Sequence, residues 1–147
     1  MDPMGELADH VEALRQVPFF RDLSADDLAG LAQIGHMETF EAGKPIVERG
    51  DQGSALYVVT EGQAEVEVGG RVHRLKPGDF FGEMALITAR RRSATVTATE
   101  PVEVLALEAG SFKPFLLENP AVAVAVLEGV VNRLREVQER IDAWIGS

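Results

Sequence analysis

The stretch Phe81-Gly82-Glu83-Met84-Ala85-Leu86, followed after a short loop by Arg92-Ser93-Ala94-Thr95-Val96, decides the fold of this chain. Gly82 can adopt backbone conformations closed to other residues, and it leaves its amide unshielded. The amides of the next three residues begin a short helical turn, and free amides at a helix start attract an anion. Arg92 can return across the loop and bind the same anion with its planar donor fork.

Glu83 needs a different partner, because a carboxylate repels a phosphate. Its oxygens are suited to accept hydrogen bonds from sugar hydroxyls. Together the glycine turn, the acid and the arginine predict a site for one phosphorylated sugar.

This segment resembles the phosphate-binding cassette of the cyclic-nucleotide-binding domain family. That family includes the catabolite activator protein, regulatory subunits of cyclic-nucleotide-dependent kinases, and cyclic-nucleotide-gated channels. The resemblance extends over roughly residues 15 to 140, because further family features occur in order. They are Phe40-Glu41-Ala42-Gly43, Gly50-Asp51, Leu56-Tyr57-Val58-Val59 and Gly78-Asp79-Phe80-Phe81.

The resemblance implies a cyclic nucleotide as ligand, with its phosphate on Gly82, Glu83, Met84, Ala85 and Arg92. Glu83 would also accept a hydrogen bond from the ribose 2′-hydroxyl. Ser93 would add a hydroxyl to the phosphate or the base, and Ala94 would keep the wall of the site thin. A threonine at the position of Ser93 favours cGMP in this family and an alanine favours cAMP. Several cAMP binders carry serine there, so cAMP is expected in preference to cGMP.

The resemblance also implies a lid. Family members close the C-terminal helix over the base with an arginine or an apolar residue near its middle. Arg133 is the polar candidate here, and Val130 and Leu134 are the apolar ones. A solvated charge on the helix surface explains Arg133 equally well. Val68, Leu75 and Met84 are further candidates for lining the apolar side around the base.

Periodicity along the chain predicts a mainly β protein with flanking helices. Residues 1–36 carry helical patterns, with Ser24 and Asp27 as an N-cap signal. Residues 37–109 alternate with period two between glycine turns, as at Gly69-Gly70, which predicts an antiparallel jelly-roll barrel containing the cassette 81–96. Residues 110–147 return to helices, the last one starting after Pro120.

The last helix, from Ala121 to about Ile145, carries a heptad pattern of apolar residues. Packing on its own barrel explains the first half, and a partner helix explains the second half better, so we expect a parallel homodimer. A nucleotide-free dimerisation module on the same scaffold is the alternative to a sensor. The repeating positions are Leu127, Val130, Leu134, Val137, Ile141 and Trp144.

Composition excludes several function classes. The net charge of −10 argues against direct contact with nucleic acid. The longest apolar stretch, Ala121 to Leu127, is too short to span a membrane, and no secretion signal opens the chain. Cysteine is absent, and the three histidines form no metal-ligand motif. We therefore expect a cytoplasmic binding module without metal rather than an enzyme; a metal-dependent jelly-roll enzyme is the weaker alternative.

Overall fold

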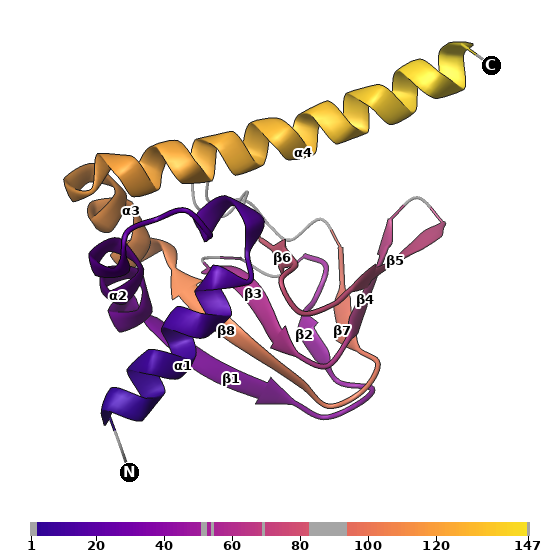
Figure 1. The fold of residues 1–147 in the computed structure, drawn as a ribbon. Coiled ribbons are helices and arrows are strands. Elements are labelled where there is room, and N and C mark those ends of the chain that lie inside the picture. The colour runs from indigo at the N-terminus through magenta and orange to yellow at the C-terminus, as the bar shows by residue number, and fades with distance from the viewer. Residues whose placement is uncertain (1–2, 51–52, 54, 69, 83–93, 147) are drawn as a thin grey trace.

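Two antiparallel sheets lie face to face, and helices from both ends of the chain cover the first of them (Figure 1). The computed structural model describes residues 3–50, 53, 55–68, 70–82 and 94–146. In chain order the elements are α1 (Pro3–Arg15), η1 (Pro18–Phe20), α2 (Ala25–Ile34), β1 (Gly35–Phe40), β2 (Pro45–Val47), β3 (Ala55–Glu61), β4 (Ala64–Val68), β5 (Arg71–Leu75), β6 (Phe80–Phe81), β7 (Val96–Ala98), β8 (Val102–Glu108), α3 (Ala109–Glu118) and α4 (Pro120–Gly146).

The first sheet has the strand order β1-β8-β3-β6, and the second has the order β2-β7-β4-β5. The predicted mainly antiparallel architecture with flanking helices is confirmed. Within the part of the chain that the structure describes, the two sheets remain separate and do not close into a barrel. The jelly-roll expectation therefore holds as a sandwich, with β1 and β6 at the edges of one sheet and β2 and β5 at the edges of the other.

Strand β8 is buried on both faces, which explains why its sequence is almost continuously apolar. Val104 packs into the cluster between the two sheets, whereas Leu105, the next residue, packs into the cluster beneath the helices. Successive side chains on a strand point to opposite faces, so a strand buried on both faces needs apolar residues at every position. Both side chains are fully buried.

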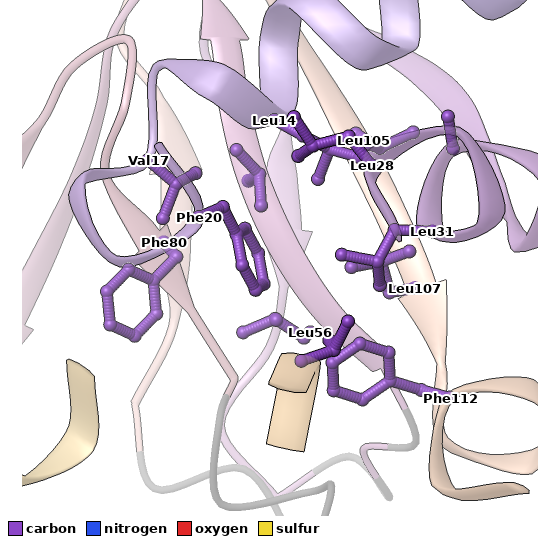
Figure 2. Close-up of a cluster of buried hydrophobic side chains, with 13 residues drawn as sticks. Leu14, Val17, Phe20, Leu28, Leu31, Leu56, Phe80, Leu105, Leu107 and Phe112 are labelled. Carbon is purple, nitrogen blue, oxygen red and sulfur yellow. The ribbon is translucent and has the colours of Figure 1, made fainter. Parts of the chain in front are cut away.

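The cluster beneath the helices is built by every helix of the fold. Figure 2 shows Leu14, Phe20, Leu28 and Phe112 pointing toward the side chains of β3 and β8. These side chains come from α1, η1, α2 and α3, and Val122 of α4 joins the same cluster. Burial of each such side chain contributes about 1.5–3 kcal/mol, so the helical layer is held to the first sheet over its whole width.

Local signals set the helix ends. Ser24 caps α2: its Oγ accepts a hydrogen bond from the backbone N–H of Asp27 at 3.1 Å, which confirms the predicted N-cap. Helices α3 and α4 meet at Asn119, whose Nδ2 donates to the carbonyl of Phe115 at 2.9 Å. Pro120 then starts α4, because proline lacks a backbone N–H and has a fixed φ that fits the first turn of a helix.

The last helix has 27 residues, as the long uninterrupted pattern after Pro120 predicted. Its first turns contact η1 and α3, and Val122 and Ala125 are buried there. Among the described helices none alone is long and apolar enough to cross a membrane. Helix α3 taken with Pro120–Glu136 reaches that length and composition, but the pair is bent by 115°.

The close packing of Gly62, in the turn between β3 and β4, can be tested against Gly43, which has a similar backbone conformation. Gly62 has φ +82°, and a Cβ there would overlap the carbonyl oxygen of Pro101 and lie 2.9 Å from the Cα of Val102. Gly43 has φ +86° and open space around it. We expect Gly62→Ala to lower the free energy of unfolding by at least about 3 kcal/mol, and Gly43→Ala by about 1–2 kcal/mol. Chemical denaturation measures both; equal losses would contradict the close packing of Gly62 on Pro101.

Candidate functional site

The segment that contains the cassette begins at the end of β6. Phe80 and Phe81 pair with Val58 and Tyr57 of β3. The ring of Phe81 stacks on that of Tyr57, with centroids 5.1 Å apart and planes 18° from parallel. Gly82 follows with φ +88°, a conformation that favours glycine. The rigid aromatic pair thus fixes the position of the glycine that begins the cassette.

The segment ends on the second sheet. Ala94 is half-buried, and the Oγ1 of Thr95 accepts a hydrogen bond from the backbone N–H of Arg49 at 2.9 Å. Val96 then pairs with Val47 of β2 and Val66 of β4 and is buried between the sheets. Gly82 and Ala94 are therefore held by different sheets.

The structure places two of the predicted ligand residues, Gly82 and Ala94. The other predicted ligand residues of the cassette lie outside the described residues, as does the side chain of Arg133. The unplaced cassette residues are Glu83, Met84, Ala85, Arg92 and Ser93.

The β4–β5 hairpin forms one side of the second sheet, next to Val96 of β7. Ala64 pairs with Leu75 and Val66 with His73, so these four residues share one face of the second sheet. Ala64 is fully buried, and Val66 and Leu75 pack against the cluster between the sheets. The expected lining residue Leu75 therefore lies on the inner face; the side chain of Val68 is not among those described.

The outer face of this hairpin is polar. Arg74 Nε lies 3.9 Å from Glu65 Oε1, and the arginine side chain is 78% exposed. An ion pair this open contributes little, at most about 1 kcal/mol. The hairpin is thus held by its inner apolar contacts rather than by its charges.

Sequence reasoning missed two residues that shape this end of the sandwich. Tyr57 was assigned only to a family strand, although it stacks on Phe81. His73 has no predicted role, because the three histidines form no metal-ligand motif, although its register places it beside Val66. The alternation of β5 could have placed His73 on the face of Leu75, two residues away. Nothing in the sequence pairs Tyr57 with Phe81.

A groove of about 710 Å³ lies at the other end of the sandwich. Its walls come from the end of β1, the start of β2, the end of β3 and the start of β8. Phe40, Pro45 and Val102 supply apolar surface, and Glu61 and Glu103 are among its acids. Strand β6 runs antiparallel to β3, so Gly82, which follows Phe81 and its partner Tyr57, lies near the Ala55 end of β3. Glu61 is at the opposite end of that strand. The groove is therefore separate from the cassette.

No group of three histidine, cysteine or acidic side chains able to hold a metal ion occurs among the residues with described positions.

Helix α4 starts beside α3 and η1 and continues as one long helix toward the C-terminus (Figure 1). Val122 and Ala125 are buried, and Val130, an apolar lid candidate, is half-buried. The other lid candidate, Leu134, is 64% exposed. The two apolar candidates for the lid therefore differ in burial along the same helix.

Comparison with known proteins agrees with this architecture. The model of the cyclic nucleotide-binding domain family matches residues 37–119. A cGMP-dependent protein kinase of Toxoplasma gondii is 40% identical over 94 residues, which cover 63% of this chain and 10% of the kinase. The chain spans 10% to 61% of the length of the first curated relatives that it matches.

Two solved structures are similar over most of the chain. The catabolite activator protein of Thermus thermophilus has a TM-score of 0.75 and 32% identity, covering 86% of this chain and 62% of that one. The regulatory domain of Toxoplasma gondii PKA, crystallised with cAMP, has a TM-score of 0.72 and 26% identity, covering 86% of this chain and 51% of that one.

Proposed function

The chain belongs to the cyclic nucleotide-binding domain family, and from this premise we propose that it is a sensor that binds cAMP in preference to cGMP. The family match over the β sandwich carries this proposal. The ligand phosphate lies on the cassette amides and on Arg92, and Glu83 accepts the ribose 2′-hydroxyl. The proposed contacts are Gly82, Glu83, Met84, Ala85, Arg92, Ser93 and Ala94, with Arg133 on the lid.

The anchoring of Gly82 and Ala94 supports this site. Two sheets that share one packed core hold the two ends of the cassette, so the cassette residues begin and end at defined positions. Preorganised donors bind a phosphate more tightly, because less conformational entropy is lost on binding. The same anchoring suits a binding module, and we propose no catalytic step, no metal and a cytoplasmic setting.

The choice of base rests on Ser93 and on the relatives. The Toxoplasma gondii PKA regulatory domain was crystallised with cAMP, and another relative is named a cGMP-dependent kinase. Family members with serine at this position include cAMP binders, so cAMP is the proposed ligand and cGMP the weaker one.

Signal output is proposed to run through α4. Phe80 packs in the cluster beneath the helices, and its neighbour Phe81 packs in the cluster between the sheets. Val122 of α4 belongs to the first of these clusters. A shift of the residues after Gly82 that moved Phe80 would therefore be transmitted to the helical layer. Such coupling works only if the two positions of α4 bind the nucleotide with different affinities.

Arg92→Ala tests the phosphate site. We expect it to weaken cAMP binding by about 30- to 150-fold, equivalent to about 2–3 kcal/mol, because its charge-assisted hydrogen bonds are lost. Isothermal titration calorimetry of nucleotide-stripped protein with cAMP and then cGMP measures this. Arg91→Ala, which removes the same charge one residue earlier, is the matched control and keeps most of the affinity.

Absence of binding by folded, stripped wild-type protein would exclude the sensor and favour the nucleotide-free dimerisation module. Equal losses in the two arginine variants would show a general effect of charge rather than a phosphate contact at Arg92.

We also propose a parallel homodimer through α4. Its exposed face carries Val124, Leu127, Val131 and Leu134, which are 53%, 62%, 44% and 64% exposed. Their spacing of three, four and three residues matches the seam of a coiled coil. The heptad expected from the sequence shares Leu127 and Leu134 with this seam, but Val130 is half-buried. No direct contact with nucleic acid or membrane is proposed for this acidic chain.

The double variant Leu127→Glu/Leu134→Glu tests this seam. We expect it to weaken the dimer at least about 100-fold, because each buried leucine contributes about 1.5–3 kcal/mol and the new carboxylates repel one another. Sedimentation velocity over a range of concentrations measures the change. Leu117→Glu, at a leucine of α3 that is 85% exposed, is the control. A wild-type chain that stays monomeric at high concentration would rule out the dimer.

A further inference from the structure

We propose that the groove at the end of the sandwich away from the cassette binds a basic segment of a partner protein, in which an arginine stands beside an apolar residue. This inference goes beyond nucleotide sensing and needs no nucleotide in the cassette. It rests on the apolar lining of the groove, on the hydrogen bonds that fix its shape, and on two carboxylates that oppose each other across its strands.

Apolar side chains line part of the groove. Phe40 of β1 pairs directly with Val102 of β8, and both side chains pack against the cluster between the two sheets. Pro45, the first residue of β2, and Pro101, directly before β8, are exposed and line the same groove. Its volume of about 710 Å³ lies in the range of pockets that enclose a ligand. The groove therefore offers room and apolar surface to a side chain of a partner.

Backbone hydrogen bonds fix the shape of the groove. The N–H of Gly43 donates to the carbonyl of Ala98 at 2.7 Å, and the N–H of Ala98 donates to the carbonyl of Lys44 at 2.9 Å. These bonds tie the turn between β1 and β2 to the end of β7. Within the turn, the N–H of Lys44 donates to the carbonyl of Glu41 at 3.1 Å. A preformed groove of this kind loses little conformational entropy when a ligand enters it.

Two carboxylates oppose each other across the strands of the groove. Glu61 of β3 is the register partner of Glu103 of β8, and like charges in directly opposed positions destabilise a sheet. The Oγ1 of Thr60 donates to Oε1 of Glu103 at 2.8 Å, which orients that carboxylate without offsetting its charge. Among the residues with described positions, neither glutamate forms an ion pair. A sequence that breaks such a local rule does so most often where function requires it.

Charge decides the class of occupant. Glu41 is the third carboxylate of the groove, and Lys44 is the single cation among the described residues that line it. Electrostatic complementarity therefore favours a basic segment and disfavours nucleic acid or an anionic lipid surface. Arginine fits the opposed glutamates better than lysine, because its planar guanidinium presents several donors to carboxylates and also stacks on aromatic rings such as that of Phe40. The apolar neighbour of that arginine then covers the exposed prolines.

The test is an NMR titration of the isotope-labelled chain, without nucleotide, with the capped peptide Gly-Arg-Leu-Arg-Gly. We expect the amide signals of Thr39, Lys44 and Glu103 to shift, with a Kd of about 0.1–1 mM, because the groove is much smaller than a standard protein interface. Gly-Glu-Leu-Glu-Gly should leave these signals unchanged. Gly-Arg-Ser-Arg-Gly should bind at least about fivefold more weakly, because serine brings no apolar surface to the groove.

The double variant Glu61→Gln/Glu103→Gln removes both charges and keeps an amide oxygen to accept the hydrogen bond from Thr60. We expect it to weaken binding of Gly-Arg-Leu-Arg-Gly at least about tenfold. The midpoint of thermal unfolding should rise by about 1–4 °C, because the like-charge pair is gone. Glu65→Gln/Glu67→Gln on β4 of the second sheet removes the same charge and is the matched control, with affinity kept within about twofold.

The outcomes separate the groove from the charge of the whole chain. Equal losses in the two double variants, or equal binding of Gly-Glu-Leu-Glu-Gly, would overturn the proposal, because attraction would not depend on these two glutamates. Absence of shifts at the groove residues up to millimolar peptide would overturn it as well. Binding of cAMP, or its absence, bears on none of these results, since Gly82 and Glu61 lie toward opposite ends of β3.

Discussion

Burial of β3 and β8 on both faces is the constraint on which the rest of the structure depends. Leu56 and Val58 of β3 face the helices, whereas Val59 faces the second sheet. Both strands therefore need a cover on each side, and a sandwich without its helices would expose an entire apolar face to water. The terminal helices are therefore part of the hydrophobic core of the domain, which the two sheets alone would leave incomplete. This explains why segments from both ends of the chain meet over one sheet (Figure 1).

The same constraint links the helical layer to the candidate site. Strand β6 has two residues, and each packs into a different core: Phe80 beneath the helices and Phe81 between the sheets. Gly82 follows directly, so the start of the cassette is attached to both packed regions. Close-packed interiors transmit small displacements because they contain few voids to absorb them. A ligand that moved this strand would therefore act on η1 and α4, which share the first cluster.

Features specified by neighbouring residues were predictable from the sequence, and features that need distant partners were not. Ser24 was identifiable as a cap because its partner is three residues away, and the long last helix followed from its uninterrupted pattern. The stacking of Tyr57 on Phe81 depends on the register between β3 and β6, which no local pattern encodes. For the site, the motif predicts a cassette over residues 81–96, and the structure describes Phe81, Gly82 and residues 94–96 of it. The heptad of α4 could be drawn through Val130 or Val131, and the two differ only in burial, Val130 being half-buried and Val131 exposed.

An acidic chain for which we propose an anionic ligand must rely on local charge. The net charge of −10 would repel a nucleotide at long range, but at physiological ionic strength charges separated by more than about 8 Å are largely screened. The potential at the site then depends on the groups within a few strands of it. Arg92 follows two further arginines in the cassette, and Arg71, Arg74 and Lys76 belong to the hairpin or its end. Within the hairpin these arginines are balanced by Glu65 and Glu67 of β4, and Arg74 Nε lies 3.9 Å from Glu65 Oε1. Under the proposed function, substitutions more than about 8 Å from the cassette therefore change the overall charge of the chain with little effect on the field at the phosphate.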